Sequence, residues 1–361
     1  MANCWPKSCD SIEQFILLDP TLFLHLSMPV TICGASYHQP KKIYSNQDFF
    51  KEFPESIGAS LEKTGVVSRA VADKSEVSSD LALAAAEKLI EQENIDRSRI
   101  GLLVYCSADF DYYTPATACV LHGKLDLPSS CGAMDLTLGC SAYIYALSAI
   151  KGMMETNGIE NALLLTASTL TRLIHPKDRS NRFLFGDAGS ATLISNKQEG
   201  SIGPFVFGTD GKGFEKIMVR DGYLRHPYTN ASWIDRKDEF GNVTNDGSFF
   251  MDGLNVFLFS VRVVPKMIAE VLAKASMKQD EIDLFIFHQP NVFLNETLRK
   301  KMNIPEEKFV HCMDKFGNTV QATIPIAISE SIRNGRLKPG MNVLLAGFGV
   351  GLSWAATIVR F

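Results

Sequence analysis

Residues 82–108, ALAAAEKLIEQENIDRSRIGLLVYCSA, run from a helical pattern through a turn into an apolar strand. The same plan returns in residues 266–291, KMIAEVLAKASMKQDEIDLFIFHQPN, where Ile282 aligns with Ile100 at an offset of 182 residues. Helices that alternate with fully apolar strands are typical of mixed or parallel sheets covered by helices. The two stretches therefore predict an α/β protein that contains a repeated unit.

Two further matches follow in the same order along the chain. The stretch GCSAYIYALSAI (139–150) resembles GNTVQATIPIAI (317–328), with Cys140 and Asn318 at an offset of 178 residues. The stretch that begins with Asn161, NALLLTAS, resembles MNVLLAGF, whose Asn342 is offset by 181 residues. Three ordered matches at a nearly constant offset predict a duplicated chain.

We predict two duplicated halves, residues 28–200 and 201–361, after an N-terminal extension of residues 1–27. An aspartate and a proline interrupt the apolar run of that extension, which makes a signal peptide a poor match. The uncharged stretch 339–359 contains a glycine-rich centre that would break a membrane helix. It is expected to form two short strands around a turn.

The bulk composition excludes several classes of function. The chain of 361 residues has a formal net charge of -4, whereas nucleic-acid-binding domains normally carry a basic surplus. Its eight cysteines include no CxxC pair, which argues against structural zinc and against a disulfide scaffold. We therefore expect reduced thiols, a cytoplasmic location, and no nucleic-acid or membrane partner.

Three polar or reactive residues are predicted to meet between the halves. If the halves pack about a pseudo-twofold axis, Cys140 and Asn318 face each other at equivalent helix starts, and His288 ends the strand equivalent to the one ending at Cys106. A helix start favours a thiolate, because its N–H groups are unpaired. Each residue also has a purely structural interpretation. Cys140 could be an inert buried thiol and His288 a core residue. Asn318 could be a helix N-cap, although Thr319 could serve as that cap instead. Their coincidence at duplicated positions favours one shared site.

These residues resemble a known family. The runs GCSAY, HQxN and GNT, in this order, resemble the β-ketoacyl-acyl carrier protein synthase III group of the thiolase superfamily. Further matches are FGDAGSATLI (185–194), KTGVVSRAV (63–71), MDGLNVF (251–257) and the ending GFGVGLSWAATIVRF. The resemblance extends from about residue 28 to the last residue. It implies an α/β thiolase-like fold of five layers, αβαβα, and a homodimer.

The resemblance also implies an activity. This activity is the decarboxylative Claisen condensation of an acyl primer thioester with malonyl-acyl carrier protein, in fatty acid or related secondary-metabolite biosynthesis. Cys140 would carry the acyl group, and His288 Nε2–H and the Asn318 amide would stabilise the enolate. The backbone N–H groups of Cys140 and Val350 would form the oxyanion hole. No cofactor or metal is expected, since the substrates are thioesters of coenzyme A or of acyl carrier protein phosphopantetheine.

Substrate-binding residues are implied in three groups. The primer pocket would contain Thr114, Tyr113 and Phe348; the coenzyme A or pantetheine channel would contain Lys63, Arg179, Gly253, Phe257 and Asn291; and the carrier-protein docking surface would contain Arg299, Lys300 and Lys301. Such a basic run can equally be a solvated helix face. Thr114 stands where acetyl-primed relatives place a phenylalanine from the partner subunit, so a deeper pocket is expected unless Tyr113 refills it.

Several positions depart from the family pattern. Ala59 and Lys63 stand where relatives that use acyl-coenzyme A often have a tryptophan and an arginine. Leu258 and Phe293 stand at positions that are basic where a carrier protein docks. The identity of the primer and of its carrier therefore stays open.

Other functions remain as alternatives. A papain-like cysteine hydrolase uses cysteine, histidine and asparagine in the same order, but LGCSAY lacks the local sequence pattern of that group, and no duplication is expected there. Within the same fold, a non-elongating acyltransferase or an enzyme that joins two acyl chains is possible, as is an inactive partner subunit. Retention of both His288 and Asn318 favours the decarboxylating condensation.

Overall fold

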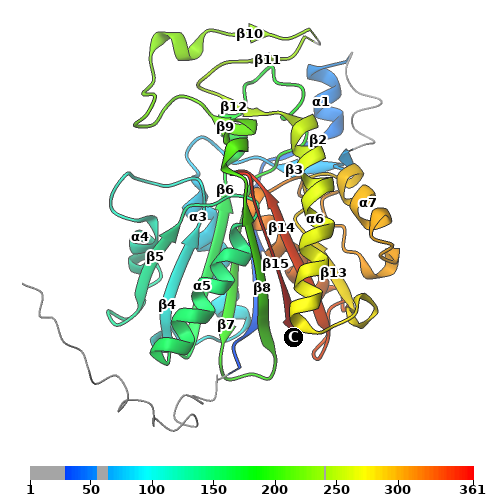
Figure 1. Ribbon diagram of the computed structural model, residues 1–361. Coiled ribbons are helices and arrows are strands. Elements are labelled where there is room, and N and C mark those ends of the chain that lie inside the picture. The colour runs from blue at the N-terminus through cyan, green and yellow to red at the C-terminus, as the bar shows by residue number, and fades with distance from the viewer. Residues whose placement is uncertain (1–28, 55–63, 240) are drawn as a thin grey trace, which may run out of the picture.

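The computed structural model describes residues 29–54, 64–239 and 241–361 (Figure 1). The predicted extension at residues 1–27 and the channel residue Lys63 lie outside these ranges. All statements on structure below refer to the described residues.

The first sheet has five strands in the order β1-β7-β6-β4-β5. The central strand β6 is parallel to β4 and antiparallel to β7. The apolar stretch after Ile100 is β4, as predicted, and its side chains are almost all buried. The strands are Thr31–His38 (β1), Ile100–Cys106 (β4), Gly132–Leu136 (β5), Asn161–Ser168 (β6) and Ala188–Ser195 (β7).

The second sheet has four strands in the order β13-β14-β15-β8. Strands β13 and β14 are parallel, and β14 and β15 form an antiparallel pair. This pair confirms the prediction of two strands around a glycine turn near the end of the chain, and no helix among the described residues is long and apolar enough to cross a membrane. The strands are Ser201–Thr209 (β8), Leu284–Phe287 (β13), Asn342–Gly349 (β14) and Ser353–Arg360 (β15).

Helices form three layers around the two sheets (Figure 1). The helices α5 (Ala142–Asn157) and α8 (Thr323–Arg333) share one buried core with strands of both sheets and therefore lie between them. A second core joins the first sheet to outer helices, and a third does the same for the second sheet. These outer helices are Ser78–Gln92 (α3), Thr117–Lys124 (α4), Gly253–Ala275 (α6) and Val292–Lys301 (α7). The order of layers is αβαβα, as the resemblance implied.

The order of elements repeats on the two sides of residue 200. Helix α3 precedes β4 as α6 precedes β13, and α5 precedes β6 as α8 precedes β14. Each main sheet draws its strands from one side of residue 200 only. The division into halves at 28–200 and 201–361 remains our proposal.

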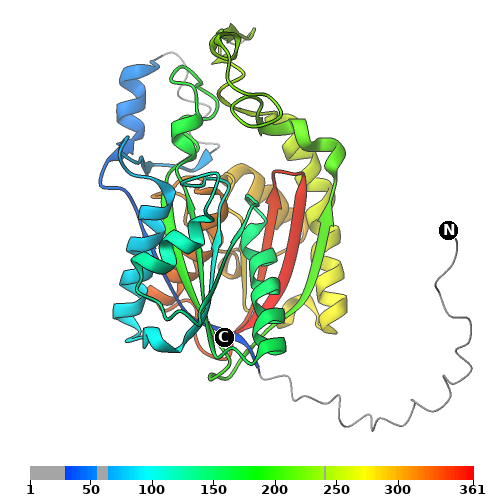
Figure 2. The same cartoon turned by 90° about the vertical axis from the view of Figure 1, so that its left-hand side faces the viewer.

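Smaller elements cap the end of the sheets where the site lies, and the hairpin β10–β11 stands highest in both views (Figures 1 and 2). The pairs are β2 (Ile43–Ser45) with β3 (Ser68–Ala70), β9 (Ile217–Val219) with β12 (Phe249–Met251), and β10 (Arg236–Lys237) with β11 (Val243–Thr244), beside helix α1 (Asn46–Glu52). Short 3-10 helices span Arg97–Arg99, Leu170–Leu173, Gly211–Lys216, Asn230–Trp233, Gln279–Glu281, Glu306–Lys308 and Val320–Ala322.

Candidate active site

One cavity collects the three residues that the sequence singled out. It has a volume of about 410 Å³ and is lined by Cys140, His288 and Asn318 together with Phe348 and Val350. Most of its remaining wall is apolar and comes from both halves of the chain, including Leu170, Leu173, Phe185, Ile217, Phe249 and Met251. This volume is in the usual range for small-molecule sites.

Cys140 lies in the turn that leads into α5. The helix begins at Ala142, and Ser141 is its N-cap but makes no cap hydrogen bond with its side chain. The Ser141 hydroxyl instead hydrogen-bonds the Ser353 hydroxyl at 2.7 Å, which ties the helix start to the second sheet. Cys140 itself is partly buried and lines the cavity.

Burial controls the ionisation of this thiol. Removal from water raises the pKa of Cys140 to about 11, while the backbone N–H groups of Val350 and Cys140 act in the opposite direction. Burial thus opposes the expectation that the helix start favours a thiolate, because the desolvation cost of the charged form exceeds the stabilisation by these donors. A pKa raised to about 11 favours the protonated thiol at neutral pH.

The two backbone N–H groups that act on Cys140 are those expected for the oxyanion hole. The chain at Val350 can lie close to the Cys140 sulfur because residue 349 is a glycine. Gly349 has a φ of +155°, and a Cβ there would lie 2.8 Å from Cys140 Sγ. The chain can approach the sulfur this closely only without a side chain. Val350 itself contacts Gly139, where an added Cβ would lie 2.3 Å from the valine side chain.

Asn318 presents the donor side of its amide to the cavity. Its Oδ1 accepts a hydrogen bond from the backbone N–H of Val320 at 2.9 Å, which assigns the amide orientation. Within the described part of the chain Nδ2 makes no hydrogen bond, so its two protons remain available to a substrate. Thr319, the expected alternative cap, makes no cap hydrogen bond with its side chain. The side-chain oxygen of Asn318 therefore accepts a hydrogen bond from the local backbone, and its side-chain nitrogen remains available as a donor.

His288 follows β13 and is 2% exposed. Its backbone N–H donates to Ala346 O at 2.7 Å, and its ring meets that of Phe348 edge-on with centroids 5.8 Å apart. Burial lowers the pKa of His288 to about 3, although the Val320 carbonyl acts in the opposite direction. The ring is therefore neutral at physiological pH and donates a hydrogen bond from one nitrogen only.

The sequence reasoning missed Asp109, which also lines the cavity. Burial raises the pKa of this carboxyl, while hydrogen bonds with Thr169 and Ser168 oppose the shift. The Thr169 N–H donates to Asp109 Oδ2 at 2.7 Å. Asp109 thus holds the start of the turn after β6, and nothing in the sequence pattern had marked it.

Of the three residues predicted to form the primer pocket, only one lines the cavity. Phe348 lines the cavity, but Thr114 and Tyr113 do not. The Tyr113 side chain is 71% exposed, and its ring contacts Tyr223, a residue of the cavity wall, at a centroid distance of 5.0 Å. Within this chain, Tyr113 therefore lies behind the wall and not inside the pocket.

None of the four described channel residues lines the cavity among the ranges that the structure covers. Asn291 is the N-cap of α7, and its Oδ1 accepts from the Leu294 N–H at 2.7 Å. Phe257 stacks on Phe293 at 5.5 Å, and Gly253 begins α6. The backbone N–H of Arg179 donates to the side chain of Asn242. Asn291 thus has a structural role that the sequence reasoning had not assigned.

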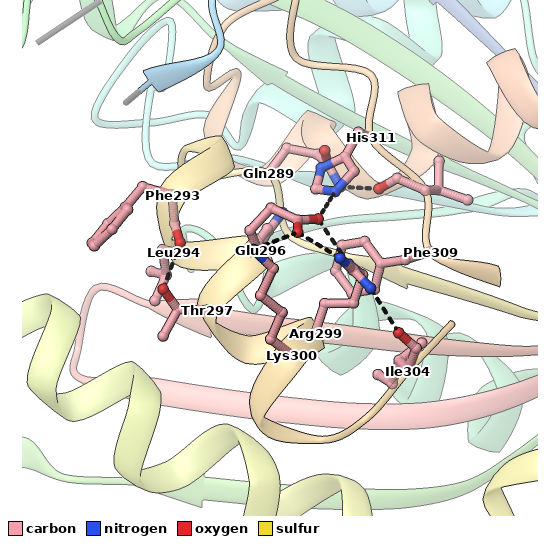
Figure 3. Close-up of polar contacts among 12 residues, drawn as sticks. Gln289, Phe293, Leu294, Glu296, Thr297, Arg299, Lys300, Ile304, Phe309 and His311 are labelled. Carbon is pink, nitrogen blue, oxygen red and sulfur yellow. Dashed lines mark hydrogen bonds and ion pairs between the residues drawn. The ribbon is translucent and has the colours of Figure 1, made fainter. Parts of the chain in front are cut away.

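The basic residues of α7 are not equally available (Figure 3). Arg299 donates to both carboxylate oxygens of Glu296 at 2.8 and 2.7 Å, and to Ile304 O at 3.0 Å. Its side chain is only 13% exposed. Arg299 and then His311 hold the pKa of Glu296 at about 2. The prediction that Arg299 faces a carrier protein is therefore corrected, because its guanidinium is already bound within the protein.

The two lysines differ as well. Lys300 is 71% exposed and lies 3.9 Å from Glu296 at its nearest oxygen, whereas Lys301 Nζ donates to Val261 O at 3.1 Å. On the same helix and on α6, Phe293 and Leu258 expose 51% and 55% of their surfaces. The exposed surface of α6 and α7 is therefore partly apolar.

The five-layered αβαβα fold, and the cavity that holds a cysteine, a histidine and an asparagine, agree with the resemblance to condensing enzymes of the thiolase superfamily. Comparison with known families agrees. The family 3-oxoacyl-[acyl-carrier-protein (ACP)] synthase III matches residues 134–211, and its C-terminal part matches residues 272–361. The chain belongs to the β-ketoacyl-[acyl-carrier-protein] synthase III family.

Individual relatives resemble the chain over almost its whole length. The β-ketoacyl-[acyl-carrier-protein] synthase III of Caldanaerobacter subterraneus subsp. tengcongensis is 31% identical over 332 residues, covering 91% of this chain and 97% of the relative. A crystal structure of a 3-oxoacyl-(acyl-carrier-protein) synthase III superposes with a TM-score of 0.90 at 40% identity, over 92% of this chain and 100% of that one. The 3-oxoacyl-(acyl-carrier protein) synthase of Burkholderia xenovorans LB400 gives 0.83 at 34% identity, over 91% and 93%.

Proposed function

We propose that this chain is an acyltransferase that condenses an acyl primer thioester with malonyl-acyl carrier protein, with loss of carbon dioxide, in fatty acid biosynthesis. The observation that carries the proposal is the cavity in which Cys140 lies with His288 and Asn318. One of these residues is a nucleophile and the other two are hydrogen-bond donors, which is the set that this condensation needs.

The first half-reaction loads the primer. Cys140 Sγ attacks the thioester carbonyl, the bond from that carbon to the primer's own sulfur breaks, and the departing thiol takes up the proton that Cys140 releases. The negative oxygen of the tetrahedral intermediate lies against the N–H groups of Cys140 and Val350, which already act on the thiol in the unliganded site. Because the thiol is protonated beforehand, its proton leaves only as the primer reacts.

The second half-reaction forms the new carbon–carbon bond. The carboxylate of the malonyl group leaves as carbon dioxide, and its electron pair becomes an enolate on the malonyl thioester. The Asn318 Nδ2–H and one ring N–H of His288 donate to the enolate oxygen. The carbanion then attacks the acyl group on Cys140, and the Cys140 thiolate departs and takes up a proton from water. The product is a β-ketoacyl thioester.

The chain's own residues supply every group in this scheme. No set of three or more His, Cys, Asp or Glu side chains in the described ranges is placed to hold a metal ion. The thioester substrates would be carried by coenzyme A or by the phosphopantetheine of an acyl carrier protein.

We further propose that the enzyme is a cytoplasmic homodimer in which Thr114 closes the partner's primer pocket. Tyr112 and Tyr113 support this, because they expose 61% and 71% of their surfaces on the loop before α4 and are available to a second subunit. A threonine in place of an aromatic ring leaves the pocket deeper. Each methylene that then reaches an apolar wall contributes about 0.8 kcal/mol, or roughly a fourfold preference.

The carrier protein would dock near the mouth of the cavity on α6 and α7. We retain Lys300 as the charged contact because its side chain is exposed, and we retain its neighbour Lys301. Arg299 is no longer proposed as a docking residue. Contact between opposite charges should weaken with added salt.

The deciding experiment supplies acyl donors from acetyl to decanoyl, on coenzyme A and on carrier protein, with malonyl-acyl carrier protein. Intact-protein mass should show an acyl group on Cys140, followed by carbon dioxide release and a β-ketoacyl product. The preference should increase over several carbons and then fall, and Thr114→Phe should remove only the longer primers. Acylation without carbon dioxide release would instead indicate a non-elongating acyltransferase.

A further inference from the structure

The tautomer of His288 decides whether it can serve the enolate. A neutral imidazole carries one proton, so only one of its nitrogens donates and the other accepts. The ring lines the cavity, and Nδ1 lies 2.7 Å from the hydroxyl oxygen of Thr323. The Val320 carbonyl also lies within hydrogen-bond reach of the ring. An Nε2 that accepts would oppose an enolate oxygen, whereas an Nε2 that donates would stabilise it.

Thr323 has one hydroxyl proton and two acceptors within reach. Besides Nδ1, the hydroxyl can donate to Val320 O, which lies 3.0 Å from its oxygen. That carbonyl, however, already accepts the backbone N–H of Thr323 at the end of the 3-10 helix. Directing the hydroxyl proton to Nδ1 therefore leaves no buried acceptor without a partner.

No other donor supplies this ring nitrogen within the described part of the chain. Pro290, two residues after His288, has no backbone N–H, and the nearby Asn295 uses Nδ2 on His288 O at 3.2 Å. Among these groups, the Thr323 hydroxyl is thus the one that can donate a hydrogen bond to Nδ1. It comes from the start of α8, on the segment that also supplies Asn318.

We propose that Thr323 is a positioning residue, whose hydroxyl donates to Nδ1 and thereby holds His288 in the tautomer with its proton on Nε2. This rests on the proposed function and adds to it the residue that makes His288 a donor. Thr323 does not touch the reacting atoms; it acts through the imidazole. No proton is transferred in the step, and the enolate is stabilised by a hydrogen bond alone.

The tautomer can be measured without any turnover. In protein labelled with ¹⁵N-histidine, the chemical shifts of the ring nitrogens distinguish the protonated from the unprotonated one, and a His288→Gln sample assigns the signals. We expect the proton of His288 on Nε2 in the unliganded wild-type enzyme. A proton on Nδ1 would overturn the proposal, even if the enzyme condenses normally.

Kinetics of three variants test the consequence. Thr323→Val keeps the shape and removes the hydroxyl, so the ring should turn its proton toward the Val320 carbonyl and decarboxylation should slow about 10- to 100-fold. Acylation of Cys140 should stay within about twofold, which also reports that the variant is folded. Thr323→Ser should restore decarboxylation to within about threefold, because it restores the donor.

A matched control separates this role from general packing. Thr319 is buried in the same segment, and among the described residues its hydroxyl has no hydrogen-bond partner, so Thr319→Val should leave both half-reactions within about twofold. Equal losses in the Val and Ser variants at position 323, or wild-type decarboxylation by Thr323→Val, would contradict the proposal. If wild-type enzyme itself releases no carbon dioxide, the proposed function fails, while the labelled spectrum still decides the tautomer.

Discussion

The two central helices begin in different ways, although they occupy equivalent places in the fold. Helix α5 follows a turn in which Cys140 lies against the glycine-rich strand end at Gly349. Helix α8 follows a short 3-10 helix, and just before that helix the side-chain oxygen of Asn318 accepts a hydrogen bond from the Val320 N–H. One start thus exposes a sulfur to its own backbone N–H and to that of Val350 from the other half. The second start orients polar side chains toward the same cavity.

This difference shows how a duplicated architecture divides a reaction. The start of α5 carries the group that forms a covalent bond, and its surroundings are backbone N–H groups. The start of α8 carries side-chain donors and, through Thr323, reaches the ring of His288. If the division is real, changes at the two starts should affect different half-reactions.

The largest effect is expected at the start of α5. Cys140→Ser should lower both acylation and condensation at least about 1000-fold, because the nucleophile is lost from both half-reactions. Intact-protein mass and product analysis measure the two steps separately. A serine variant that still forms β-ketoacyl product at a comparable rate would remove Cys140 from the mechanism.

Changes at the donors should separate the half-reactions. His288→Ala and Asn318→Ala should each slow malonyl decarboxylation by about 100- to 1000-fold, since each removes one donor from the enolate. Acylation of Cys140 should remain within a few-fold, as judged by the rate of mass increase with an acyl donor. Normal carbon dioxide release by both variants would show that the roles are assigned wrongly.

Gly349→Ala should disturb the start of α5 alone. The new methyl group would lie 2.8 Å from Cys140 Sγ at a φ of +155°, so acylation should fall about 10- to 100-fold and stability by about 1 to 3 kcal/mol. Gly152→Ala in α5 is the control, because nothing lies within 4 Å of its added Cβ. That variant should be more stable by about 0.5 to 1 kcal/mol. Thermal unfolding and acylation rates measure both, and wild-type acylation by Gly349→Ala would argue against close packing at the sulfur.

A prediction that needs no substitution concerns the pH dependence of Cys140. With the pKa raised to about 11, the reactive thiolate fraction should grow about tenfold per pH unit from neutral to pH 10. Alkylation of Cys140 by iodoacetamide, followed by peptide mass spectrometry, should rise in the same way. A plateau near pH 7 would mean that the helix start and its donors outweigh burial.

Much of the fold was predictable from local pattern. The strand after Ile100, the strand before His288 and the final strand pair are apolar runs bounded by turn residues, and such runs form buried strands wherever they lie in a chain. The repeat then placed Cys140 opposite Asn318. The cavity brings these two residues together with His288.

The errors concern side-chain contacts that the residue types alone did not reveal. Arg299 looked like a docking residue on an exposed helix, but Glu296 and the Ile304 carbonyl bind its guanidinium. Asn291 looked like a channel residue, but it caps α7. No motif in the sequence pointed to Thr323, because its proposed role depends on a contact with the ring of His288, which lies 35 residues earlier.

By itself, the amino-acid sequence determined the alternation of helices and strands, the repeat, and the chemical identity of the three site residues. These follow from residue type and from neighbours a few positions away. Only the tertiary structure decided that the Cys140 thiol stays protonated, that Asn318 presents its nitrogen, and that a threonine contacts His288. Desolvation and hydrogen bonding depend on which atoms pack together in space. At Cys140 these atoms include Val350 from the other half of the chain, and at His288 the partner lies 35 residues further along.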